Sequence, residues 1–453
     1  MSATPSARTP TTRLIIAALA AFALAVPLFV VFMLTADRAE QSRAAQDSIS
    51  DGWGGAQVVA GPVLVIPYRA ARTTSGGDDA QQAQALETRT VAPEALQLTT
   101  GLSPEVRSRS IYQAVVYEAE MQGRAVFTLP ADLGESGIDP ARFDLTRAEL
   151  RFSLGDARGL GANPVVTANG APLRLQPAGQ GRGFFARLDA AALAGGRIEV
   201  RFGFHLRGNG SLALVPQAGD TSWTVASSWP HPSFQGSFLP ADHAIGEDGF
   251  RATYRIGNLA LGQSLVTQGD TSSPPVDART GTPGAAASAR IDLVQPVDLY
   301  AQVGRATKYG FLFIGFTFLA LLLFDIVGGA RVRAAEYLLV GAGLVLFFVL
   351  LLAFAEVIGF APAYLIAAGA IAGLTTAYSA AVLRSWRRAG VVGTLMVTLY
   401  GVLYLLLNLE AYSLVIGSVL LFLVLAGVMY LTRHIDWGGE GHYDEALSVE
   451  PGH

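Results

Sequence analysis

The residues of this chain best suited to chemistry lie in and just after one short stretch, SSWPHPSFQGSFLP, at residues 227–240. His231 and Ser233 lie within it, and Asp242 and His243 follow almost at once. These are the residue types of a hydrolytic triad, but a triad is defined by geometry and not by closeness in sequence. Asp242 and His243 are adjacent, so in an extended segment their side chains point to opposite faces. A metal site made of His231, His243 and Asp242 is a further alternative.

A structural interpretation fits the same stretch better. Pro230 and Pro232 fix φ and hold the chain extended. Trp229 and Phe234 are large enough to anchor it in a core, and Gly236 permits a close approach or a turn. The stretch is then predicted to be a packed crossover between strands, and a surface that binds a partner remains the other possibility.

A second set of charged residues lies at the ends of apolar segments. Glu356 and Glu410 each end such a segment, and Arg305 and Lys308 introduce another. A charge at mid-bilayer costs about 2.5 to 3.5 kcal/mol, so charges near a membrane usually pair or serve transport. We predict that Arg305 and Lys308 pair with Glu356 or Glu410. An ion or proton pathway is the alternative.

The chain lacks the sequence motifs of known catalytic sites. It has no Walker loop, no G-x-S-x-G elbow, no H-E-x-x-H and no G-x-G-x-x-G after a strand. It also has no cysteine, which excludes thiolate metal sites and disulfides. The net charge of −4 offers no basic stripe for nucleic acid. We therefore predict no catalytic residue, cofactor or metal, and no nucleic-acid partner.

The composition of the chain indicates a membrane protein. Of its 453 residues, 51% are hydrophobic and only 15% are charged, which is too apolar for an ordinary soluble protein. A helix that crosses the hydrocarbon needs about 20 apolar residues, and six segments meet or approach that length. They are Leu14–Leu34, Tyr309–Gly328, Tyr337–Ile358, Ala361–Leu383, Val391–Leu409 and Tyr412–Leu431. Six crossings put both termini on one side.

Arginine placement predicts which side that is, because Lys and Arg near span ends stay in the cytoplasm. Basic residues precede the first span and follow the second, fourth and sixth. They are Arg8, Arg13, Arg331, Arg333, Arg384, Arg387, Arg388 and Arg433. The alternate loops, at residues 356–361 and 408–411, contain none. Both termini are therefore predicted to be cytoplasmic, with the large middle domain outside.

The first span could instead be a cleaved signal peptide. Its 21 uncharged residues exceed the usual length of a cleavable core, about 7 to 15 residues. Leu34, Thr35 and Ala36 also form a poor small-residue cleavage pattern. An uncleaved signal anchor is favoured.

The middle of the chain predicts a helix followed by strands. Ala36–Asp51 is alanine-rich and charged, which favours a helix that stops at Gly52. The short apolar runs after it, bounded by Gly, Pro, Asn or Asp, predict a β-sandwich or related sheet domain. These runs are VVAGPVLVIPY, SIYQAVVYEAEM, AVFTL, AELRFSL, RIEVRFGFHL, SLALV, TSWTVASSW and FRATYRI. Residues 73–85 and 269–289 are predicted loops.

Six stretches together resemble the CreD family of inner-membrane proteins. They are residues 52–68, 227–240, 308–325, 355–368, 399–418 and 431–437, and they cover nearly the whole chain in order. The resemblance implies a bacterial inner-membrane protein linked to cell-envelope integrity, in the regulon of a two-component system, which affects colicin or β-lactam responses. It implies structural hallmarks and no active-site roles. The hallmarks are Trp53, Trp229, His231, Phe234, Glu356, Glu410 and Trp437.

The predicted protein is thus an α-helical polytopic membrane protein with a large β-rich extracytoplasmic domain. Its predicted parts are residues 1–35 (cytoplasmic N-terminus and signal anchor), 36–307 (stalk and β-domain), 308–437 (five-helix bundle) and 438–453 (cytoplasmic tail). The expected role is non-enzymatic and involves contact with lipid, cell wall or another envelope protein. A transporter that uses the rim carboxylates and a periplasmic hydrolase are the rival functions.

Overall fold

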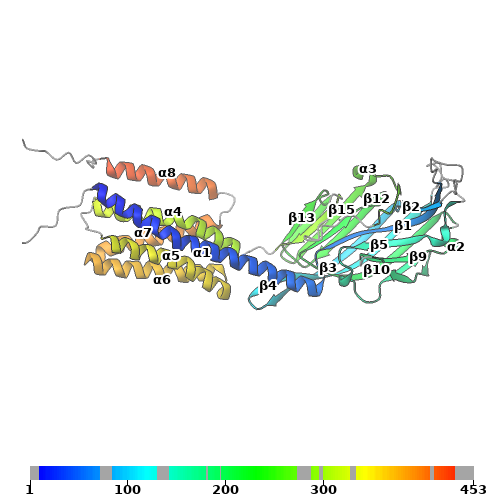
Figure 1. Ribbon diagram of the computed structural model, residues 1–453, viewed down its shortest axis with the longest axis horizontal. Helices are drawn as coiled ribbons and strands as arrows, with labels where there is room; N and C mark the ends of the chain where they lie inside the picture. The colour runs from blue at the N-terminus through cyan, green and yellow to red at the C-terminus, as the bar shows by residue number, and fades with distance from the viewer. Residues whose placement is uncertain are drawn as a thin grey trace, which may run out of the picture. The chain divides into compact units, whose positions relative to one another are not determined.

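The computed structural model describes residues 10–71, 84–129, 142–179, 182–193, 195–272, 287–294, 299–326, 333–408 and 413–433. The chain divides into two compact units, one made of Met1–Gln41 and Val297–His453 and the other of Ser42–Pro296. The first unit is helical and the second consists mainly of strands (Figure 1). The sequence-based boundaries after residues 35, 307 and 437 are finer than this division and stay predictions.

The long helices of the described residues are α1 (Pro10–Trp53), α4 (Leu299–Ile326), α5 (Ala334–Ile358), α6 (Phe360–Leu383), α7 (Trp386–Asn408) and α8 (Ser413–Thr432). Among the described residues, five helices are long and apolar enough to cross a membrane: α1, α4, α5, α6 and α7. The apolar stretch of α8, Val415–Tyr430, is shorter. The predicted helix over Ala36–Asp51 is confirmed, since α1 runs without a break to Trp53.

Small residues let the helices of the first unit approach closely. A Cβ on Gly341 of α5 would lie 1.9 Å from Leu24 Cδ1 of α1, and a Cβ on Gly310 of α4 would lie 2.9 Å from Phe348 Cε2 of α5. A side chain at either glycine would therefore push two helices apart. Association of helices in a membrane depends on such close contact, because lipid removes the hydrophobic drive between them.

The strands form two sheets. The first has the order β13-β17-β11-β1-β5-β9-β8, with β2 paired to β1 and β16 paired to β2. Its strands are β1 (Gln57–Ala71), β2 (Gln84–Val91), β5 (Glu149–Leu154), β8 (Leu175–Pro177), β9 (Gly183–Arg187), β11 (Ser211–Val215), β13 (Pro232–Gly236), β16 (Val266–Gln268) and β17 (Ala289–Leu293).

The second sheet has the order β14-β15-β12-β3-β4-β10-β6-β7. Its strands are β3 (Ala95–Arg109), β4 (Tyr112–Thr128), β6 (Val165–Ala168), β7 (Ala171–Pro172), β10 (Arg197–Asn209), β12 (Asp220–Ser227), β14 (Asp242–Gly246) and β15 (Gly249–Gly257). Short helical segments join some of them, at η2 (Leu145–Arg147), η3 (Ala157–Gly159), α2 (Ala190–Leu193) and α3 (Asn258–Leu261).

The two sheets share one hydrophobic core. β10 alternates buried and more exposed residues along most of its length, as a strand does when one face is covered. Leu64 and Leu150 of the first sheet belong to the same buried cluster as Tyr117 and Ile198 of the second. Trp223 is completely buried in it, and its indole N–H donates a hydrogen bond to Thr100 Oγ1 at 2.9 Å.

One sequence prediction about the strands is wrong. Residues 110–121 and 125–129 were expected as separate strands, but they form the single strand β4. Gly123, at the expected break, pairs with Phe202 of β10. A Cβ on Gly123 would lie 2.1 Å from Phe202 Cζ, so the ring lies over the glycine and fills the space that a side chain would take. The strand continues because both neighbours, β3 and β10, pair with it through this point.

Candidate functional site

The stretch at residues 227–240 is fastened to the end of β17. The Trp229 indole N–H donates to the Val294 carbonyl at 3.0 Å, and the Val294 N–H donates to the His231 carbonyl at 3.3 Å. Pro232 begins β13, an edge strand that pairs antiparallel with β17. The segment is thus a crossover that leaves β12 in the second sheet and contributes a strand to the first, and that strand was not predicted.

Phe234 links this segment to the second sheet. Its ring centroid lies 5.4 Å from that of His243 and 5.9 Å from that of Phe250, both in edge-to-face arrangements. His243 lies on β14 and Phe250 on β15. Aromatic pairs in this arrangement contribute about 0.5 to 1.5 kcal/mol beyond their buried area. Phe234 therefore ties together the edges of both sheets.

The polar residues of this region are not assembled as a triad. Ser233 Oγ accepts a hydrogen bond from its neighbour Gln235 at 2.9 Å. His231 is exposed, and so are Asp242 and His243 on β14. No hydrogen bond joins Ser233 to these three residues, all of which are described. The described residues also include no group of three His, Cys, Asp or Glu that could hold a metal ion.

Trp53, at the end of α1, is held between two arginines of the second sheet. The Arg107 guanidinium carbon lies 3.7 Å from the indole ring centroid, and that of Arg207 lies 4.7 Å from it. The indole N–H donates to the Tyr117 carbonyl at 3.3 Å. Each cation over a tryptophan face contributes about 0.5 to 2 kcal/mol, depending on desolvation. This Trp53 clamp fixes the last turn of α1 against β3, β4 and β10.

Gln57, four residues after the clamp, satisfies the backbone where the chain turns into β1. Its amide N–H groups donate to the carbonyls of Asp156 and Arg207 at 3.1 and 2.9 Å, and its Oε1 accepts from Asp156 N–H at 3.2 Å. Gln57 is fully buried. A Cβ on Gly54, at φ +118°, would lie 2.8 Å from the Arg207 carbonyl oxygen. Gly54 thus lets the chain approach β10 closely.

Two titratable groups border Gln57. Tyr117 is completely buried, and its hydroxyl donates to the Ser211 carbonyl at 2.7 Å. Burial raises the pKa of Tyr117, so it stays a neutral donor. The Arg158 guanidinium lies 2.7 Å from the Asp156 carboxylate and holds the pKa of that carboxyl below its usual value. Both groups therefore fix structure and are not poised for proton transfer near neutral pH.

Glu356 lies near the end of α5 and contacts two other helices. The Tyr300 hydroxyl of α4 donates to its carboxylate at 3.2 Å, and Arg38 Nε of α1 lies 4.0 Å from the same oxygen. The Glu356 side chain is only 15% exposed. One cation against Glu356 is thus Arg38, which the sequence did not predict. The predicted pairing of Arg305 or Lys308 with Glu356 stays a prediction. The sequence missed Arg38 because it assigned that residue to the stalk.

The other predicted rim contacts stay predictions. Lys308 is exposed and forms no ion pair with any residue that the structure describes. Glu410 and Trp437 lie outside the described residues. Pairing of Arg305 or Lys308 with Glu410 is therefore neither supported nor contradicted.

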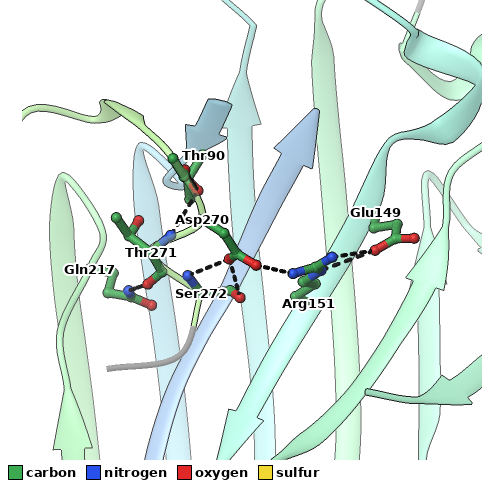
Figure 2. Close-up of polar contacts among 8 residues, drawn as sticks. Thr90, Glu149, Arg151, Gln217, Asp270, Thr271 and Ser272 are labelled. Atoms are coloured by element: carbon green, nitrogen blue, oxygen red, sulfur yellow. Dashed lines mark hydrogen bonds and ion pairs between the residues drawn. The ribbon is translucent and has the colours of Figure 1, made fainter. Parts of the chain in front are cut away.

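Figure 2 shows a polar cluster on the first sheet that the sequence did not reveal. Arg151 of β5 lies 2.7 Å from Glu149 and also pairs with Asp270. Asp270 accepts hydrogen bonds from the backbone and hydroxyl of Ser272 at 3.0 and 2.5 Å. Burial alone would raise the pKa of Asp270, but the Ser272 hydrogen bonds and the Arg151 charge lower it overall. Arg151 and Asp270 are far apart in sequence, so no local pattern could have paired them.

Thr90 and Gln217 fasten the same segment. Thr90 Oγ1 donates to the Gly269 carbonyl at 2.8 Å and accepts from Thr271 N–H at 3.1 Å. The Gln217 amide donates to the Thr271 carbonyl at 2.9 Å (Figure 2). Residues 269–272 are therefore held to β2, β5 and the turn after β11. Because the charged groups of the cluster are paired with one another, we assign it a structural role.

Comparison with known proteins identifies the family. A family model described as inner membrane protein CreD matches residues 9–438. The chain belongs to the CreD family. The inner membrane protein CreD of Escherichia coli (strain K12) is 30% identical to it over 420 residues, which cover 91% of this chain and 90% of that protein. The resemblance found in the sequence is thereby confirmed, and the apolar helices of this CreD-family chain are those of a multi-pass inner-membrane protein.

The Trp53 clamp predicts a stability defect on truncation. Trp53→Ala removes two cation–π contacts and one hydrogen bond, so we expect it to destabilise the protein by about 2 kcal/mol. Trp53→Phe keeps a ring between the arginines and should recover part of the loss. The measurement is the temperature at which half of the full-length protein in detergent leaves the monodisperse peak.

Trp386→Ala serves as the matched control for this experiment. Trp386 is 75% exposed, so its removal should shift that temperature much less. Equal shifts for the two alanine variants would contradict the clamp.

The Glu356 contacts predict coupling between helices α1 and α5. Glu356→Gln and Arg38→Met should each lower the thermal stability of the full-length protein in detergent. The free energy of unfolding of the double variant should fall by about 0.5 to 1 kcal/mol less than the sum of the two single losses, because each single substitution breaks the same contact. Lys308→Met is the control, and its effect should add to that of Glu356→Gln. Strict additivity of Arg38 and Glu356 would disprove the pair.

Proposed function

We propose that this protein is a non-enzymatic scaffold of the inner membrane that maintains the integrity of the cell envelope. The observation that carries the proposal is the set of contacts that the candidate residues make. Trp53, Trp229, Phe234 and Glu356 each connect separate structural elements. Side chains used in this way support a role in holding parts of a structure together rather than in turnover of a substrate.

The cellular setting of the proposal comes from the family. We infer membership in the regulon of a two-component system, with effects on envelope stress and on colicin or β-lactam responses. The protein would act by contact with lipid, cell wall or another envelope protein. The β-domain supports this, because Ser42–Pro296 form a compact unit separate from the helices that would anchor the protein in the membrane.

The proposed topology has six crossings, with both termini in the cytoplasm and the β-domain in the periplasm. Five apolar helices and the 20-residue α8 support the number, and the arginine pattern supports the orientation. We further propose that the two sheets pack face to face as a sandwich. Their shared buried cluster supports this arrangement.

The topology predicts which positions are accessible from the periplasm. Because the chain has no cysteine, single cysteines can be placed by Ser6→Cys, Asp248→Cys and Ser448→Cys. In spheroplasts, a membrane-impermeant maleimide should label the cysteine at position 248 only, and the other two should react after permeabilisation. Labelling at position 448 without permeabilisation would mean an odd number of crossings. Loss of residue 6 from the mature chain would indicate a cleaved signal peptide.

The function is tested by complementation of a strain that lacks the protein. His231→Ala combined with Ser233→Ala should restore resistance to detergent and β-lactam to the wild-type level, because the scaffold does not use these side chains chemically. Glu356→Gln should restore resistance in proportion to its membrane level, which is measured by blot. Each variant is compared with wild type at matched expression.

Two results would favour the rival functions. Failure of the His231 and Ser233 variant at normal membrane levels would favour a hydrolase. Failure of Glu356→Gln at normal levels would favour a transporter that uses the rim carboxylate.

A further inference from the structure

β14 is an open edge of the second sheet. It spans Asp242–Gly246, ends the strand order and pairs only with β15 within the described part of the chain. All five of its residues are exposed. An edge strand of this kind presents unpaired backbone groups on which another extended chain can form hydrogen bonds.

The register shows which backbone groups face outward. Gly246 pairs with Gly249 across the two-residue turn of Glu247 and Asp248, and a turn of this length closes with a hydrogen-bonded pair. Hydrogen-bonded and non-hydrogen-bonded pairs then alternate along the strands. Ala244 and Asp242 therefore bond to β15. His243 and Ile245 direct their N–H and C=O groups away from it, toward the open edge.

The other three ends of the two main strand orders each contain a proline. They are β7 with Pro172, β8 with Pro177 and β13 with Pro232. Proline cannot donate a ladder hydrogen bond and is a common means of blocking an edge. β14 contains no proline, lysine or arginine. Among the four ends of the two main strand orders, β14 is therefore the one whose edge no proline blocks.

One face of β14 carries an exposed apolar side chain, Ile245. His243 and Ile245 lie opposite the buried residues Ala252 and Phe250, so their side chains share the core-side face. Ile245 is nevertheless 51% exposed, and Leu239, just before the strand, is 66% exposed. Apolar side chains of an added strand would cover Ile245 on this face.

The other features of the edge are acidic. Asp242, Glu247 and Asp248 are exposed and form no ion pair with any described residue, and Arg251 of β15 is the nearest cation on the paired strand. Pairing of β14 with a second copy of itself would gather six carboxylates around one short interface. A segment that carries Lys or Arg would instead neutralise them.

We propose that β14 is a docking edge for an extended segment of another envelope protein, in which apolar residues alternate with Lys or Arg. The segment adds as a further strand beside His243 and Ile245, with its apolar side chains toward Ile245 and its basic side chains toward the acidic residues. The open edge and its charge are observations on the β-domain alone, whereas the choice of an envelope protein as the occupant rests on the function and topology proposed above.

The test uses a fluorescein-labelled peptide, Lys-Val-Lys-Val-Lys-Val-Lys, and the full-length protein in phosphatidylcholine nanodiscs. Fluorescence anisotropy should show saturable binding that empty nanodiscs lack. Ile245→Lys places a charge on the edge and should weaken binding about tenfold or more. Gln176→Lys, at the exposed β8 edge of the other sheet, is the matched control and should leave binding unchanged.

N-methylated peptides separate strand addition from simple charge attraction. Alternate residues of a strand direct their N–H groups to opposite edges. Methylation of the valine nitrogens or of the lysine nitrogens therefore blocks one edge each, and only one of the two peptides should lose binding. Equal binding of both, or no saturable binding of the parent peptide, would overturn the proposal. So would light scattering that shows a dimer of the wild-type protein that Ile245→Lys dissociates, because the occupant would then be a second copy.

Discussion

The most demanding point in the chain is the passage from α1 into β1. A helix leaves its last carbonyls without partners, while β1 begins to pair with β11 at Gln57 and with β5 at Val59. Gln57 holds the start of β1 in place, because its buried amide bonds to backbone groups of both Asp156 and Arg207. The Trp53 clamp holds the helix end while Gly54 lets the chain pass close to β10. The position of β1, and through it of the first sheet, depends on these contacts.

The two units have no disulfides, because the chain has no cysteine, and they are stabilised in different ways. The strand unit buries large side chains in its hydrophobic core, such as Trp223 and Tyr254, whose rings stack at 5.0 Å. The helical unit depends on small residues, since Gly341 and Gly310 let helices touch. The difference follows from the solvent: water drives apolar burial between sheets, whereas lipid does not drive it between helices.

Some charged residues in the strand unit pair with one another. Arg124 and Arg201 flank Glu199 and hold its pKa at about 2. Arg151 lies between Glu149 and Asp270 and pairs with both carboxylates. Asp242, Glu247 and Asp248 at the β14 edge form no ion pair with any described residue, and other acids of the unit, such as Glu94 and Asp220, form none either. What distinguishes the first three is their place beside an open strand edge. That place favours a protein that acts by contact.

The sequence alone determined the classes of structure, since these depend on local composition. In lipid, the backbone groups of a long uncharged run can all be hydrogen-bonded within the run only if it forms a helix, so the apolar helices could be predicted from the sequence. The resemblance to CreD could also be recognised from the sequence. Alternating and β-branched runs identified most central strands. The sequence did not reveal ten of the strands in the described residues, because most of them are short and several contain prolines, glycines or many polar residues. They are β2, β3, β6, β7, β8, β9, β13, β14, β16 and β17.

Tertiary structure decided which distant residues meet. The sequence named Trp53 and Glu356 but not Arg107, Arg207 or Arg38, since the partners of a side chain depend on sheet order and helix packing. The tertiary structure also joins two predicted strands across Gly123, where the ring of Phe202 fills the space beside the glycine. The amino-acid sequence determines which groups must be buried or paired, because the free-energy cost of exposing an apolar group or leaving a polar group unpaired depends on that group itself. Only the fold determines which partner each group contacts, because the partner lies far away in the sequence.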